Sequence, residues 1–398
     1  MIKFALRRNL IYVLQYIIWS LLRFILAIFM DTSFKLGKSY IFIQSIFFGE
    51  TLAGAIMLIS QKKYNKKKKD QYFMSIKLIS LEDNKLLVPR DNKITMLFFI
   101  FLITFLDMVA FSLLNNYLPR LINLSKSILK RLYGFTTIFC FFFYVNTLKL
   151  PVYRHHKFSV LVIGICLIVI IVSEFCFQKF DIFSTYGNLG IAFFYIIIGQ
   201  IFWSFMNIVE KYLFEYDFMN PFVVLLYQGL MGFVLSFFFL FDKIYFYDFV
   251  LIYKNNSVGR FVLFIFLLLA YIILSGGKNL FRVVTTKIYS PMVTTLADYI
   301  LNPFYLTYYF VAHNDFKKNG KLGVFYFVLN IIISLIISFF GCVYNEFIIL
   351  FFCGLERDTH DQISKRAGIK IDTQVDSIKI DDGNSSINNE IDNESLIE

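Results

Sequence analysis

Charged and amide side chains interrupt several of the longest apolar runs of this sequence, and they are the residues best suited to binding a ligand. If these runs cross a bilayer, a charged group near its centre costs about 2.5–3.5 kcal/mol or more, so each is a candidate functional residue. The candidate binding residues are Glu50, Asp107, Lys126, Lys130, Arg131, Asn279, Lys287 and Asp298.

Their spacing suggests what they could bind. Lys126 and Lys130 are four residues apart and share one face of a helix. Lys287 and Asp298 are eleven residues apart, about three turns, and are expected to share a face too. Lysine offers a point charge and arginine a fork for phosphate, so one interpretation is a cationic cavity for an anionic or phosphorylated solute. In that cavity the carboxylates would act as counter-ions or proton-linked groups.

The other interpretation is structural: interhelical ion pairs, or basic side chains that extend to the membrane surface. We expect this for Glu210 and Lys211, which lie where a helix is expected to end, and for Arg23 and Gln15 in the first apolar run. A further polar cluster precedes the ninth expected helix: Lys278, Asn279 and Arg282.

Enzyme and metal motifs are missing from the sequence. It contains no glycine-rich phosphate loop, no HExxH and no GxSxG. All four histidines, His155, His156, His313 and His360, are expected at or beyond helix ends. The five cysteines form no CxxC pair, which argues against a disulfide framework or zinc site. We therefore predict no enzyme, no cofactor and no metal, and keep a lipid-modifying intramembrane enzyme as a minor alternative.

The composition indicates the elements that hold these residues. Of 398 residues 58% are hydrophobic and 17% charged, whereas a soluble domain has about a quarter charged. A helix needs about 20 apolar residues to cross a bilayer. The sequence thus predicts an all-α membrane protein with ten transmembrane helices, at Leu10–Met30, Leu36–Ser60, Ile94–Asn115, Pro119–Leu148, His156–Cys176, Gly187–Val209, Asn220–Phe241, Arg260–Leu280, Ser290–Val311 and Lys321–Asn345.

The distribution of charge predicts the orientation of the helices. The formal net charge is +11, but the basic residues lie mostly between apolar runs, which favours cytosolic loops over nucleic-acid binding. The lysine-rich loop 61–93 would then be cytosolic, and ten crossings would leave both termini there as well. The segment 356–398 is acidic and lacks helical periodicity, so we expect a disordered cytosolic tail.

The ten expected helices divide into two sets of five, at about 10–176 and 187–345. Because five is odd, the second set has to be inverted relative to the first. In both sets the fourth helix begins with polar residues, at Leu121–Arg131 and Thr285–Asp298. Inverted repeats of this kind place a solute site near the middle of the membrane, where the halves meet.

Four segments resemble the drug/metabolite transporter superfamily, in its nucleotide-sugar-transporter-like (solute carrier family 35, EamA-like) branch. They are Tyr40–Leu52 with Glu50 after a glycine, Ser125 with Arg131, Glu210–Phe233, and NLFRVVTTKIYSPMVTTLAD at Asn279–Asp298. The order and spacing agree over most of residues 10–345. The resemblance implies ten helices, inverted five-helix repeats and alternating-access transport.

Together these observations predict a secondary transporter for a small anionic metabolite, nucleotide-sugar-like or phosphorylated, in a Golgi, ER or endolysosomal membrane. The partners would be the solute and the lipid bilayer, and a homodimer is left open. The stretch Asp392–Ile397 reads D-x-x-x-L-I and resembles an acidic dileucine signal for a sorting adaptor. The main rival is a non-transporting scaffold or regulator that acts through the lysine-rich loop and the tail.

Overall fold

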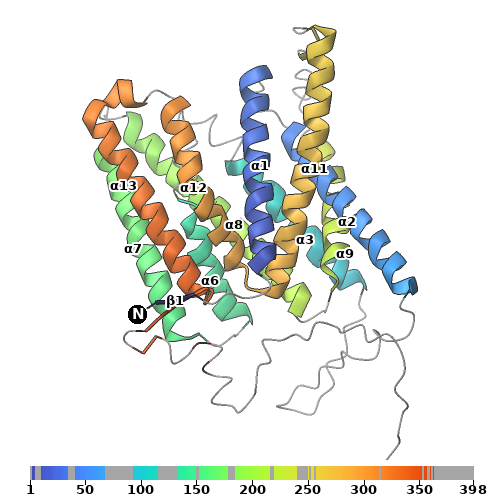
Figure 1. The fold of residues 1–398 in the computed structure, drawn as a ribbon, viewed down its shortest axis with the longest axis horizontal. Coiled ribbons are helices and arrows are strands. Elements are labelled where there is room, and N and C mark those ends of the chain that lie inside the picture. The colour runs from blue at the N-terminus through green and yellow to red at the C-terminus, as the bar shows by residue number, and fades with distance from the viewer. Residues whose placement is uncertain are drawn as a thin grey trace, which may run out of the picture.

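The computed structural model is a bundle of helices (Figure 1). It describes residues 2–4, 10–34, 41–67, 93–114, 132–148, 152–177, 184–215, 219–239, 250, 252–254, 257–312, 315–351, 354–355, 359 and 362.

Each expected apolar segment overlaps a helix of this part of the chain, although residues 119–131 of the fourth lie outside it. The helices are α1 (Leu10–Phe34), α2 (Ile41–Lys67), α3 (Lys93–Ser112), α6 (Gly134–Leu148), α7 (Arg154–Phe177), α8 (Ser184–Glu215), α9 (Pro221–Phe239), α11 (Val258–Ile288), α12 (Met292–Ala312) and α13 (Asp315–Tyr344). Seven of them, α1, α2, α3, α7, α8, α11 and α13, contain a stretch long and apolar enough to cross a membrane, and α6 and α9 contain shorter apolar stretches. The chain is an integral, multi-pass membrane protein.

The helices form two packed groups (Figure 1). At one side α7 packs against α13, α13 against α12, and α6 against both α7 and α12. At the other side α2 packs against α9 and α11, and α3 against α9. The helices α1 and α8 join the groups, because α1 contacts α11 and α12 while α8 contacts α3 and α6.

A short β-pair closes one end of the bundle. Strand β1 (Ile2–Phe4) pairs antiparallel with β2 (Ile348–Leu350), which directly follows α13. The chain segment before α1 and the segment after α13 therefore lie at the same end of the molecule (Figure 1).

Glycines allow the closest helix contacts. A Cβ atom added to Gly49 of α2 would collide with the backbone of α11 at Ile272 and Gly276, and one added to Gly276 would collide with Gly49. Gly54 and Gly229 bring α2 and α9 equally close. Small residues of this kind let helix backbones approach within a membrane, where lipid offers no hydrophobic drive for packing.

Two helix ends differ from the sequence prediction for the same reason. Hydropathy ends the sixth helix at Val209 and the eighth at Leu280, but α8 continues to Glu215 and α11 to Ile288. The first polar residues beyond those points, Glu210, Lys211 and Arg282, are buried and paired with neighbouring helices, so they do not need to leave the bundle. The chain breaks instead at Tyr289–Pro291, where proline lacks an N–H and restricts the residue before it.

Candidate functional site

The segment Lys278–Arg282 of α11 carries several of the polar side chains inside the bundle, and Arg282 is the more buried of its two bases. Its Nη1 donates to Glu210 Oε2 of α8 at 2.5 Å, and its Nη2 donates to the Gln228 side-chain oxygen of α9 at 3.3 Å. The Glu210 side chain has no exposed surface. A guanidinium held this way has a charged and a neutral acceptor in a buried site, which is an arrangement suited to structure rather than to release.

The adjacent Asn279 joins α11 to α2. Its Nδ2 donates to Glu50 Oε1 at 2.6 Å, and Glu50 is 1% exposed. The close approach at Gly49 and Gly276 brings these two side chains together. Two of the residues predicted from the sequence, Glu50 and Asn279, thus contact each other directly. We call Glu50, Glu210, Gln228, Asn279 and Arg282 the buried cluster.

A second group surrounds Asp298 of α12. Lys278 Nζ lies 3.9 Å from Asp298 Oδ1, and the Tyr16 hydroxyl of α1 donates to Asp298 Oδ2 at 3.4 Å. Lys278 Nζ also lies 5.5 Å from the centre of the Tyr16 ring. We call Tyr16, Lys278 and Asp298 the accessible cluster, because the Lys278 and Asp298 side chains are 14% and 16% exposed. Its ion pair is longer and less buried than the one between Arg282 and Glu210, so it is easier to exchange for a ligand.

Asp107 of α3 faces the same region from the other side. It accepts a hydrogen bond from Trp203 Nε1 of α8 at 3.0 Å. Tyr133, just before α6, hydrogen-bonds to Asp298. The carboxylate of α3 is therefore held by a tryptophan of α8. The carboxylate of α12 is held by tyrosines of α1 and of the residues just before α6.

Lys287 does not lie with Asp298. The two residues belong to different helices, because α11 ends at Ile288 and α12 begins at Met292, so the expected shared face is wrong. The side chain of Lys287 is exposed, and its carbonyl oxygen accepts a bond from Lys211 Nζ at 3.0 Å. Lys211 also bonds the Tyr289 carbonyl and Glu215, each at 2.7 Å, so it ties α8 to the break after α11. Asp298 has Lys278 as its basic partner instead.

Three predicted residues, Lys126, Lys130 and Arg131, lie outside the described residues, as do the tail signal Asp392–Ile397 and most of the lysine-rich loop.

The sequence prediction gave too little weight to several residues of these clusters. Glu210 was assigned to a helix end, yet it lies inside α8 and is the counter-ion of Arg282. Gln228, Trp203 and Tyr16 carry no charge, so hydropathy does not single them out. The available signal was an isolated amide in an apolar run, as at Gln228, because such a group requires a partner in lipid.

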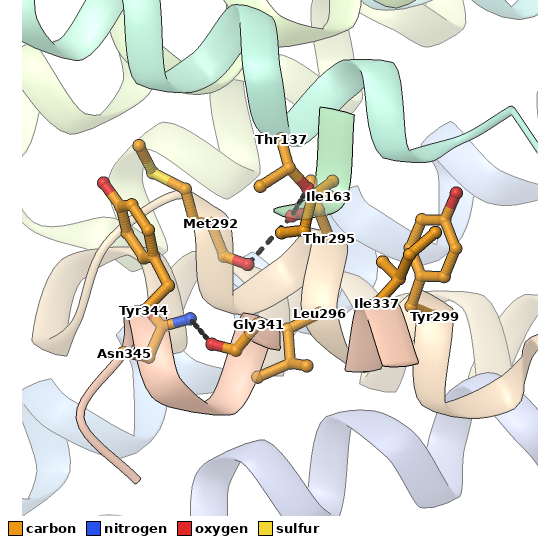
Figure 2. A pocket seen from close by; sticks show the side chains of 10 residues that line it. All are labelled: Thr137, Ile163, Met292, Thr295, Leu296, Tyr299, Ile337, Gly341, Tyr344 and Asn345. Atoms are coloured by element: carbon orange, nitrogen blue, oxygen red, sulfur yellow. Dashed lines mark hydrogen bonds between the residues drawn. The ribbon is translucent and has the colours of Figure 1, made fainter. Parts of the chain in front are cut away.

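The structure also contains a small cavity, apart from both clusters. Figure 2 shows it between α6, α7, α12 and α13, with the Thr137 and Thr295 hydroxyls 2.8 Å apart on its wall. Its volume of about 10 Å³ corresponds to about one water molecule, so it is too small for a metabolite. The candidate site is the accessible cluster, because its lysine and carboxylate are partly exposed.

This arrangement is suited to holding and releasing a charged solute. It offers a lysine, carboxylates and aromatic donors in one region of the bundle, with the buried cluster supporting α11 behind them. Among the described residues, no group of three or more histidine, cysteine or acidic side chains could hold a metal ion.

Comparison with known proteins leaves the family open. No protein-family model matches the chain, and no curated protein matches it either.

Proposed function

We propose that this chain is a secondary transporter that moves a small anionic metabolite, nucleotide-sugar-like or phosphorylated, across an internal membrane by alternating access. It is built from two inverted five-helix halves, α1–α7 and α8–α13, with both termini cytosolic. The observation on which the proposal depends is the polar seam between these halves. Tyr16, Glu50 and Asp107 of the first half bond to Asp298, Asn279 and Trp203 of the second.

The pattern of helix packing supports an internal repeat. Most contacts between helices have a counterpart when the halves are exchanged: α1 packs on α11 as α8 packs on α3, and α2 packs on α11 as α9 packs on α3. The smaller contacts of α11 with α8, α9 and α12 have no counterpart of similar extent on α3. In the same way α6 packs on α7 as α12 does on α13, and α1 on α12 as α8 on α6. The contacts α2–α9, α6–α12 and α7–α13 map onto themselves. A two-fold relation between the halves accounts for all of the matched contacts.

Individual residues follow the same relation. The two tryptophans of the chain lie on corresponding helices and contact corresponding partners: Trp19 of α1 covers Gly277 of α11, and Trp203 of α8 bonds Asp107 of α3. Gly54 of α2 faces the backbone of Leu226, while Gly229 of α9 faces the backbone of Thr51. Positions 54 and 229, like 51 and 226, are 175 apart, so one shift relates both contacts.

The transport cycle follows from the difference between the two clusters. Arg282, Glu210 and Gln228 of the buried cluster keep α8, α9 and α11 of the second half together through all states, because separating the ions in lipid is costly. In the accessible cluster an anion takes the place of Asp298 beside Lys278, which loosens α12 from α11. The halves then rock about the filled site, and Asp298 returns to Lys278 when the anion leaves.

The test is counterflow uptake by the purified full chain in liposomes, screened against nucleotide sugars, sugar phosphates and organic cations. We expect saturable exchange of an anion, with the initial rate at least about tenfold lower in Lys278→Gln, because a charge-assisted bond contributes about 1.5–3 kcal/mol. Lys62→Gln, at an exposed lysine of α2, is the matched control and leaves the rate unchanged.

Two results would argue against the proposal. Exchange that Lys278→Gln leaves intact would move the site elsewhere in the protein. If the protein exchanges no compound of the panel although its thermal transition shows that it is folded, the scaffold or regulator interpretation is favoured.

A further inference from the structure

A third base, Arg23, lies on the inward side of α1. The lipid-facing stripe of this helix is exposed and apolar: Ile11, Leu14, Ile18, Leu22, Ile25 and Phe29. The inward stripe is buried and includes Tyr16, Ser20 and Met30. Arg23 lies seven residues after Tyr16 and seven before Met30, so it belongs to the inward stripe. Of the two roles expected for Arg23, packing and an interfacial position, the interfacial one does not fit this place on the helix.

The position of Arg23 along the axis of α1 also indicates that its side chain stays inside the bundle. Arg23 is thirteen residues from Leu10 and eleven from Phe34, which is about 20 Å and 16 Å along the helix axis. An arginine side chain is too short to cover either distance, so its charge stays within the bundle.

Within the described part of the chain, the Arg23 guanidinium makes no hydrogen bond and no ion pair. The groups that act on it electrostatically are Tyr271, Tyr305, Tyr16 and Asp298, and more weakly Glu50 and Asp107. Tyr271 and Tyr305 are both at most 6% exposed. Among the described residues, Arg23 is thus a half-buried cation with no carboxylate in direct contact, whereas Arg282 has a carboxylate at 2.5 Å.

These residues form a second level above the accessible cluster. Arg23 follows Tyr16 by seven residues on α1, and Tyr305 follows Asp298 by seven on α12, while Tyr271 precedes Lys278 by seven on α11. Seven residues are about two turns, or 10 Å, along a helix. The seam between α1, α11 and α12 therefore carries one base at each of two levels, Lys278 and Arg23.

We infer that Arg23 is an anion-binding residue of the transport path, and that its ligand is the phosphate group of a phosphorylated solute. The inference rests on the proposed function, because it places this site on the same seam. Arginine does not lose its proton in proteins, and a cation within a membrane-spanning helix is unfavourable when no acceptor bonds it directly. A phosphate accepts two bonds from the guanidinium fork, and the tyrosine hydroxyls can donate to its other oxygens. With phosphate bound, the guanidinium of Arg23 therefore gains the acceptor that it lacks among the described residues.

The test uses the purified full chain and inorganic phosphate. The thermal unfolding midpoint is measured against increasing phosphate, with chloride adjusted to constant ionic strength, for the wild type, R23Q, R23K and R260Q. Arg260 is an exposed arginine at the start of α11 and serves as the matched control. R23M, of similar length, repeats the measurement if R23Q is not recovered in folded form.

We expect phosphate to raise the wild-type midpoint saturably and R260Q to behave like the wild type. In R23Q the apparent affinity falls about 10- to 100-fold, the loss of one charge-assisted contact, and R23K lies between. Without phosphate R23Q unfolds at the same or a higher temperature, because it removes a charge that no acceptor among the described residues bonds directly. A lower midpoint combined with an unchanged phosphate response would assign Arg23 a structural role and overturn the inference, as would a wild type that does not respond to phosphate.

The two proposals can fail separately. A phosphate response that depends on Arg23, in protein that transports nothing on the panel, keeps the anion site and removes the transport function. Transport of a phosphorylated solute with the same KM in R23Q as in the wild type keeps the function and removes the site.

Discussion

Replacing Glu210 with alanine tests whether the buried cluster holds the bundle together. The substitution leaves Arg282, which is 8% exposed, with only the Gln228 oxygen at 3.3 Å as an acceptor. Removing one partner of a buried ion pair costs about 3–5 kcal/mol, because the remaining charge cannot be solvated. We therefore expect Glu210→Ala to lower the free energy of unfolding by about that amount, measured by titrating SDS into the purified protein in mild detergent and following tryptophan fluorescence.

A second glutamate on the same helix provides the control. Glu215 pairs with Lys211 at 2.7 Å, but its side chain is 50% exposed. An exposed pair of this kind contributes about 0–1 kcal/mol, so Glu215→Ala is expected to change the stability by less than 1 kcal/mol. The double variant Glu210→Leu/Arg282→Met removes both charges together and should recover most of the loss. The reasoning is refuted if Glu210→Ala costs no more than Glu215→Ala.

Two further predictions concern packing and the α3–α8 contact. Gly276→Leu is expected to destabilise the protein by more than 2 kcal/mol, because its side chain collides with Gly49 of α2, while Gly259→Ala, which has nothing within 4 Å, is neutral in the same SDS titration. In a Trp19→Phe background, where Trp203 is the single tryptophan, Asp107→Ala should shift the emission maximum, since it removes the 3.0 Å acceptor of the indole N–H. An unchanged spectrum would mean that this bond does not form in the membrane protein.

The positions of the apolar helices along the described chain follow from the sequence because hydropathy is a local property. A run of about 20 apolar residues is stable in a bilayer only as a helix, whatever its neighbours are. Each expected run accordingly overlaps a helix of the described chain, and seven of the helices meet the length and apolarity needed to cross. The ends at Glu215 and Ile288 were missed because they depend on partners that lie on other helices.

The sequence by itself determined that this is a multi-pass helical membrane protein, and it identified Glu50, Asp107, Asn279 and Asp298 as polar groups inside the bundle. Only the tertiary structure decided their partners. It paired Asn279 with Glu50 and Asp298 with Lys278, gave Arg282 the overlooked Glu210, and left Lys287 exposed. The physical reason is that the cost of placing a charge in lipid depends on one residue alone, whereas the group that offsets this cost comes from another helix, up to 229 residues away in these pairs.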